Sequence, residues 1–138
     1  MDAELNSQLP PKARKFLEET TMKSIFGIPD EALDAIMALA YQLYQVGRYS
    51  EVEVLCRGLI AADHKYWWSY SLYAATLRRL GKLEEAIDAL DKGLVYEPNE
   101  PKLLFMRNEI REALAHLRAN PVATGAGAPS TPNPQIAA

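Results

Sequence analysis

Residues 62–70, ADHKYWWSY, hold the side chains of this chain that are best suited to chemistry. A carboxylate, an imidazole, a lysine amine and four aromatic rings fall within nine positions. Asp63 and His64 are the residue types of a general acid–base pair or of two metal ligands. A zinc site needs further ligands, and the only other histidine, His116, lies in the last expected helix. We therefore expect His64 to be a turn residue at a helix end, and the sequence predicts no cofactor and no metal.

No other set of side chains in the sequence predicts catalysis. There is no ordered serine–histidine–aspartate set with supporting glycine turns, and no glycine-rich loop that would cradle a phosphate. The single cysteine, Cys56, occupies a position typical of an apolar residue on the buried face of a helix, which indicates a core thiol rather than a nucleophile. We expect a protein that is not an enzyme.

Composition narrows the class of partner. The formal net charge of −3 gives no basic face for nucleic acid, so we expect no nucleic-acid partner. Hydrophobic residues make up 49% of the chain, enough to bury a core, but no apolar run reaches the length of a membrane span. The first residues lack the apolar stretch of a signal peptide. We expect a cytoplasmic protein with no direct membrane insertion.

Glycines and prolines divide the chain into helices, and no segment alternates with a period of two. The motifs GRYSE (47–51) and GKLEE (81–85) begin 34 residues apart, which is the period of the tetratricopeptide repeat. The fold class predicted is therefore all-α, a tetratricopeptide superhelix of about two full repeats with flanking N- and C-terminal helices. The positions expected to pack the repeats are Leu39, Ala40, Gly47, Ala74, Gly81, Ala86 and Pro98.

This register divides the chain into parts and splits ADHKYWWSY between two repeats. Asp63 and His64 fall at the junction, and Trp67 opens the next helix. The expected parts are a disordered N-terminus (1–9), an N-terminal helix and candidate dimerisation segment (10–28), a tetratricopeptide domain (29–118, with repeats at about 33–66 and 67–100 and a capping helix at 101–118) and a disordered tail rich in proline, glycine and alanine (119–138).

The first helix of each repeat lines the concave side of such a superhelix, so residues between its packing positions point into a groove. Aromatic residues, methionine and arginine are enriched at recognition surfaces. We expect an apolar, aromatic groove with a basic rim that binds a peptide, or that the chain's own N-terminal segment fills. The residues expected to line it are Met37, Tyr41, Tyr44, Gln45, Trp68, Ser71, Ala75, Arg78 and Phe105.

Three segments resemble a known family. These are LAYQLYQVGRYSEVEVLCRGLIAADH (39–64), LRRLGKLEEAI (77–87) and NEPKLLFM (99–106). They are similar to the class II (LcrH/SycD-like) tetratricopeptide chaperones of bacterial type III secretion, over roughly residues 28–107. The family has three full repeats and a closing helix, whereas this chain stops after the first helix of the third.

The resemblance implies a cytoplasmic bacterial chaperone. Its client would be a secreted translocator protein, whose hydrophobic segment the groove would hold in a soluble, secretion-competent state. The family's groove aromatics match Tyr41 and Tyr44 here, and the family's mode of dimerisation implies a homodimer formed through residues 10–28.

A second function stays open from the residues themselves. Arg78, Arg79 and Lys102 lie on the expected inner face and could hold carboxylates. The alternative is therefore a general tetratricopeptide adaptor or scaffold that binds an acidic peptide or a C-terminus. Binding by such a basic clamp would weaken steeply with salt, whereas binding by an apolar groove would not.

Overall fold

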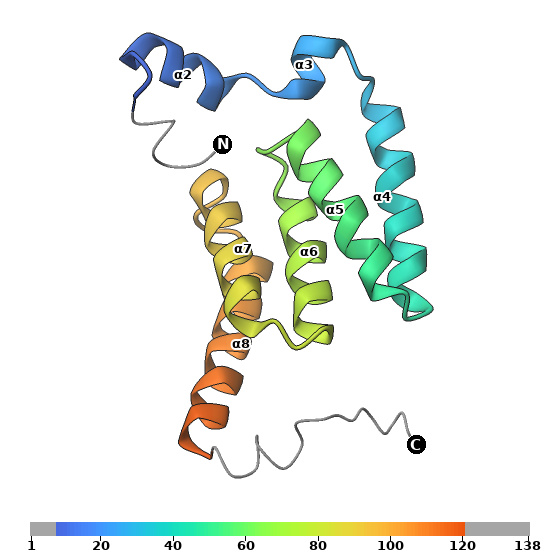
Figure 1. The fold of residues 1–138 in the computed structure, drawn as a ribbon, viewed down its shortest axis with the longest axis vertical. Coiled ribbons are helices and arrows are strands. Elements are labelled where there is room, and N and C mark those ends of the chain that lie inside the picture. The colour runs from blue at the N-terminus through green and yellow to red at the C-terminus, as the bar shows by residue number, and fades with distance from the viewer. Residues whose placement is uncertain (1–7, 121–138) are drawn as a thin grey trace.

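The computed structural model of the chain describes residues 8–120, and these residues form seven helices and no strand (Figure 1). The predicted disordered ends, 1–9 and 119–138, fall outside the described residues except for residues 8–9 and 119–120. No helix within 8–120 is long and apolar enough to cross a membrane. The helices are α2 (Pro11–Glu19), α3 (Met22–Phe26), α4 (Asp30–Gln45), α5 (Tyr49–Ala62), α6 (Trp67–Arg79), α7 (Leu83–Tyr96) and α8 (Pro101–Ala119).

The pairs α4–α5 and α6–α7 are two helical hairpins that stack side by side, with α8 against α7 (Figure 1). Each hairpin turns at a glycine with positive φ, 86° at Gly47 and 80° at Gly81. This left-handed conformation is strained for any residue with a Cβ. The residue after each glycine donates its N–H back into the first helix, from Arg48 to the Leu43 carbonyl (2.9 Å) and from Lys82 to the Leu77 carbonyl (2.8 Å). The predicted all-α tetratricopeptide architecture is confirmed.

Small residues let the helices approach closely. Ala40, Ala74 and Ala86 have no exposed surface, and they belong to two clusters of buried side chains that run through the stack. At Gly93 of α7 an added Cβ would lie 3.0 Å from the Tyr70 Cβ of α6. The α6–α7 contact, the largest between helices in the described part, thus depends on a side chain being absent.

Leu39 and Pro98 differ from their predicted packing roles. Leu39 is 48% exposed and its neighbour on the same face, Ile36, is 38% exposed. A residue in this position packs against the repeat that precedes its own, and no such repeat stands before α4 in the described residues. Pro98 is exposed in the turn after α7, where it bounds the helix without contributing to the core.

The two ends of the stack differ in polarity. Ala40 and Ala74 face the second helix of their own repeats, and the corresponding residue of α8 is Asn108. In the same register Leu77 is buried, whereas Arg111 of α8 is exposed. The face of α8 that would receive a further helix is therefore polar, as an end cap requires. The α4 end, with Ile36 and Leu39, has no such cap.

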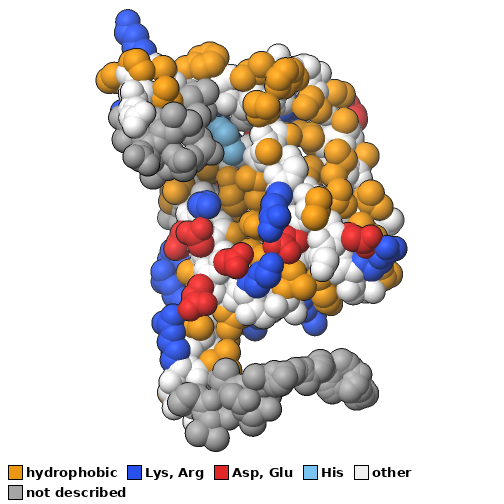
Figure 2. All heavy atoms as spheres, in the orientation of Figure 1, with side chains coloured by type: hydrophobic (Ala, Val, Ile, Leu, Met, Phe, Trp, Pro, Cys, Tyr) orange, Lys and Arg blue, Asp and Glu red, His pale blue; other side chains and the backbone are white. Residues whose placement is uncertain are grey.

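Residues 10–28, expected as one helix, form the two helices α2 and α3. Thr20 and Thr21 adopt extended backbone between them, and the Thr21 hydroxyl accepts a hydrogen bond from the Ser24 N–H as an N-cap (3.1 Å). Lys23 of α3 pairs with Asp30 (2.8 Å) and Asp63 (3.1 Å). This segment lies across the upper tips of the helices, above the turn between α5 and α6, and leaves hydrophobic side chains on its surface (Figures 1 and 2).

Candidate peptide-binding groove

A hollow of about 520 Å³ lies between the first helices of the repeats, α4, α6 and α8. Six of the residues predicted for the groove line it together: Met37, Tyr41, Tyr44, Trp68, Ser71 and Ala75. Lys102, expected on the inner face as part of a basic clamp, also lines it, and the structure adds Asp34, Ala38, Leu72 and Met106.

Three predicted groove residues do not line this hollow. Gln45 is exposed beyond the end of the lining, and Phe105 is 62% exposed. Met106, the next residue, lines the hollow in place of Phe105. Arg78 lines an adjoining hollow at the end of α6.

The lining residues that were not predicted from the sequence recur with the 34-residue repeat period. Ala38, Leu72 and Met106 follow one another at intervals of 34 residues. Asp34, Trp68 and Lys102 do the same one turn earlier. Projecting each groove position onto all three first helices would therefore have found them.

The aromatic side chains of the groove are accessible to a partner. Tyr41 is 54% and Trp68 is 43% exposed. Trp68 stacks on Trp67 with ring centroids 4.3 Å apart, and the Lys102 ammonium lies 4.9 Å from the centre of the Trp68 ring. These contacts hold the Trp68 ring in place although nearly half of the residue is exposed. Covering such surface stabilises a complex by about 25 cal/mol for each Å² of apolar area buried.

The groove becomes basic toward the C-terminal end of α6. Tyr44 lines both the main hollow and the adjoining one, which is also lined by Arg78 and Arg79. Arg79 Nε donates to the Tyr44 hydroxyl oxygen (3.3 Å), a contact that raises the pKa of the guanidinium. Arg78 pairs with Glu109 of α8 at 3.3 Å.

The stretch ADHKYWWSY is a repeat junction in the structure. The His64 ring stacks on Tyr96 with centroids 5.5 Å apart, and its carbonyl accepts a hydrogen bond from the Tyr70 hydroxyl (2.7 Å). Asp63 pairs with Lys23. Across the described residues, histidine, cysteine, aspartate and glutamate form no group of three that could hold a metal ion. These contacts tie the junction to α3 and to the second repeat.

Burial raises the pKa of the Cys56 thiol to about 12, so Cys56 carries almost no thiolate near neutral pH. A cysteine reacts as a nucleophile through its thiolate. Cys56 is a core side chain of the first repeat, packed with Ala40 and Val52.

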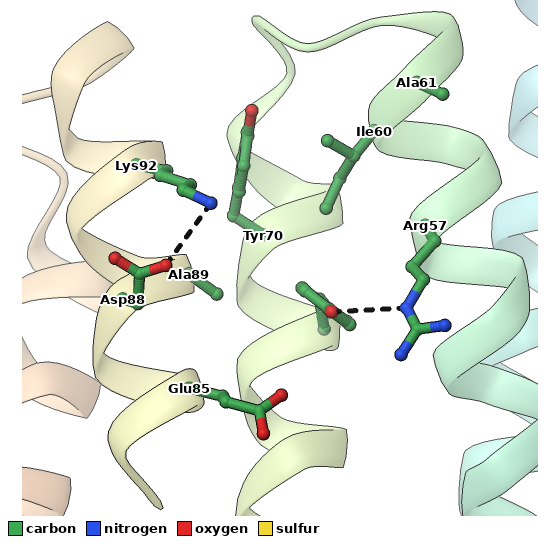
Figure 3. Close-up of a pocket in the computed structure, with 9 residues that line it drawn as sticks. Arg57, Ile60, Ala61, Tyr70, Glu85, Asp88, Ala89 and Lys92 are labelled. Atoms are coloured by element: carbon green, nitrogen blue, oxygen red, sulfur yellow. Dashed lines mark hydrogen bonds and ion pairs between the residues drawn. The ribbon is translucent and has the colours of Figure 1, made fainter. Parts of the chain in front are cut away.

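A second hollow, of about 450 Å³, opens on the opposite side of α6, between α5 and α7 (Figure 3). Its floor includes Tyr70 and Ile60, and acidic and basic side chains surround it (Figures 2 and 3). Three of these charged side chains already have partners, since Lys92 pairs with Asp88 (3.3 Å) and Arg57 Nε donates to the Tyr73 hydroxyl (3.5 Å). The hollow between the first helices is more apolar and is the better candidate for a peptide.

Comparison with known proteins supports the repeat, and chaperones of type III secretion are among the similar proteins. The tetratricopeptide repeat family matches residues 33–53. Chaperone protein SicA of Salmonella typhimurium is 29% identical over 93 residues, which cover 67% of this chain. The matched part is 56% of SicA, so the chain spans little more than half the length of the curated relatives it matches.

Solved structures of translocator chaperones share the fold. The type III secretion translocator chaperone SycD of Yersinia enterocolitica superposes with a TM-score of 0.68 at 23% identity, over 72% of this chain and 74% of SycD. PcrH, solved in complex with the chaperone-binding region of PopD, gives a TM-score of 0.61 at 25% identity, over 67% of this chain and 69% of PcrH. The chain has the tetratricopeptide-repeat fold, and its resemblance to the class II chaperones of type III secretion is confirmed.

Proposed function

We propose that this protein is a chaperone of type III secretion that holds a hydrophobic segment of a secreted, translocator-type protein in the groove between α4, α6 and α8. The observation that carries the proposal is the open apolar lining of this groove, with Tyr41 and Trp68 about half exposed. The relative PcrH, solved with the chaperone-binding region of PopD, supports the same class of client. The proposal places the protein in the bacterial cytoplasm, where a client is made before export.

The dimensions of the groove suit a short extended segment. Helix α6, which lies between α4 and α8, has 13 residues and is about 20 Å long. Extended chain advances about 3.3 Å per residue, so on the order of six residues would lie along it. Alternate side chains of the segment would face the apolar lining, and the polar rim formed by Asp34 and Lys102 would face its backbone.

Co-expression with a hydrophobic translocator protein of the same organism tests this function. Wild-type protein should keep the translocator soluble and co-purify with it. Tyr41→Glu places a charge in the apolar lining and removes an aromatic contact, so affinity should fall by about 2 kcal/mol or more, roughly thirtyfold. Val54→Glu is the matched control, because Val54 is 64% exposed on α5, outside the groove. Equal loss in the two variants, or no loss with Tyr41→Glu, would refute groove binding.

We also propose that the protein is a homodimer through its N-terminal end. Ile36 and Leu39 leave the α4 end of the stack apolar, and Phe16, Ile25 and Phe26 of residues 10–28 are each more than half exposed. Self-association would bury these side chains, whereas the polar end at α8 needs no partner.

A general adaptor for acidic peptides is the second candidate. Arg78, Arg79 and Lys102 favour it because they lie along the groove. However, Arg78 already pairs with Glu109, and the main hollow is lined chiefly by apolar side chains. The hydrophobic client is therefore the better-supported function, and binding that survives high salt would distinguish it from the adaptor.

A further inference from the structure

One cation of the groove is fixed in place without an acidic partner. The Arg79 guanidinium carbon lies 5.8 Å from the centre of the Tyr44 ring and 5.9 Å from that of Tyr49, and these rings meet edge to face with centroids 5.3 Å apart. Its Nε donates to the Tyr44 hydroxyl. No carboxylate among residues 8–120 forms an ion pair with it. By contrast, ion pairs with carboxylates are formed by Arg48, Arg57, Arg78, Arg107 and Arg118.

Helix capping alone does not explain this arrangement. A basic residue in the last turn of a helix is favoured by the helix dipole, and Arg79 is the last residue of α6. Its guanidinium, however, lies over aromatic rings of α4 and α5 rather than at the carbonyls of its own helix. Two tyrosines thus restrict a side chain that otherwise loses considerable entropy on binding, and they leave most of its donors unused.

Arg79 lies in a hollow that continues from the apolar groove. Tyr44, Ala75 and Met106 line both the main hollow and the basic hollow that contains Arg79, so the two are continuous. At the opposite end of the groove Lys102 shares the lining with Asp34, so positive charge there is offset. A segment lying in the groove would therefore meet net positive charge at the C-terminal end of α6.

We propose that Arg79 determines client specificity by binding a carboxylate of the client beside its hydrophobic anchors. The inference rests on the proposed chaperone function and adds to it the chemistry and direction of the bound segment. Trp68 and Arg79 lie eleven residues apart on α6, about 16 Å along the helix, which corresponds to roughly five residues of extended chain. The carboxylate should therefore lie about five residues from the side chain that contacts Trp68.

An array of overlapping 12-residue peptides from the co-purifying translocator provides the probe. Each peptide is made in its native form, with every aspartate and glutamate replaced by the amide, and with its C-terminus either free or amidated. Dissociation constants are measured for wild type, Arg79→Gln and the matched control Arg118→Gln, whose arginine pairs with Glu84 on the surface. The comparison of amide substitution with C-terminal amidation distinguishes a side-chain carboxylate from a terminal one.

We expect Arg79→Gln and the acid-to-amide change each to weaken binding about tenfold, and the two together to weaken it no further than either alone. Raising the salt concentration should remove the difference between acidic and amide peptides. The affinities of acidic and amide peptides are compared on the same variant, so an effect of Arg79→Gln on folding does not change the comparison. Equal affinity of acidic and amide peptides for the wild type, with hydrophobic binding intact, would overturn the inference and leave the chaperone function standing. Failure of every peptide to bind would overturn both.

Discussion

Replacing Gly93 with alanine tests the close approach of α6 and α7, the two helices of the second repeat. In an open helix interior, glycine to alanine stabilises a protein by about 1 kcal/mol. At Gly93 the new methyl would lie 3.0 Å from the Tyr70 Cβ and 3.2 Å from the Leu103 Cδ1. The Tyr70 Cβ is bonded to the α6 backbone and its ring is fixed by the hydrogen bond to the His64 carbonyl, so it cannot swing aside.

The expected magnitude follows from these two effects. Overfilling a packed core costs about 1–3 kcal/mol, which more than offsets the gain in helix propensity. Gly93→Ala should therefore be destabilised by about 1 kcal/mol. Gly58→Ala on α5 is the control, because its Cβ would meet nothing within 4 Å, and it should be stabilised by about 1 kcal/mol. The two variants should differ by about 2 kcal/mol, or on the order of 10 °C in melting temperature.

Urea unfolding followed by circular dichroism at 222 nm measures this difference. The midpoint should fall for Gly93→Ala and rise for Gly58→Ala, with unchanged slopes. If Gly93→Ala were stabilised as much as Gly58→Ala, α6 and α7 would not approach as closely as described, and the account of how the second repeat packs would be wrong.

Two further outcomes follow from burial and exposure. Burial raises the pKa of Cys56 from 9.0 to about 12 and that of Tyr70 from 10.0 to about 12, so the unfolded chain loses these protons first. The stability that the protonated groups contribute is present below about pH 9 and should be lost as pH rises toward 12. The loss should be shallower in Cys56→Ala. A free energy of unfolding that does not change with pH over this range would contradict the prediction. At the α4 end, Leu39→Glu should convert a dimer to a monomer in sedimentation at tens of micromolar, while Val95→Glu, at a 71% exposed site on α7, should not; a dimer that persists in Leu39→Glu would exclude this surface.

The repeat could be predicted because it depends on local chemistry that recurs along the chain. Gly47 and Gly81 are needed wherever the backbone takes a positive φ, and Ala40 and Ala74 wherever two helices cross closely. The same register brought Tyr41 and Trp68 to one groove. Each of these features follows from one helical hairpin and its immediate neighbour.

The features that were not predicted depend on contacts between helices that the 34-residue repeat pattern does not specify. Leu39 is exposed because no repeat precedes its own in the described residues. Phe105 lies one repeat period after Ser71 but does not line the hollow and is 62% exposed. The tyrosine contacts of Arg79 involve Tyr49 of α5, a residue outside the first helices to which groove positions were assigned. Such features follow from the assembled stack rather than from any single helix.

Site-specific photo-crosslinking tests the central claim, that the client lies between the first helices, most directly. A photoreactive amino acid would replace Tyr41, which is half exposed in the groove, or Ala61, which is exposed beside the hollow between α5 and α7. After co-expression with the translocator and irradiation, we predict a crosslinked complex from position 41 and none from position 61. Crosslinking from position 61 alone would place the client on the opposite side of α6 and contradict the account.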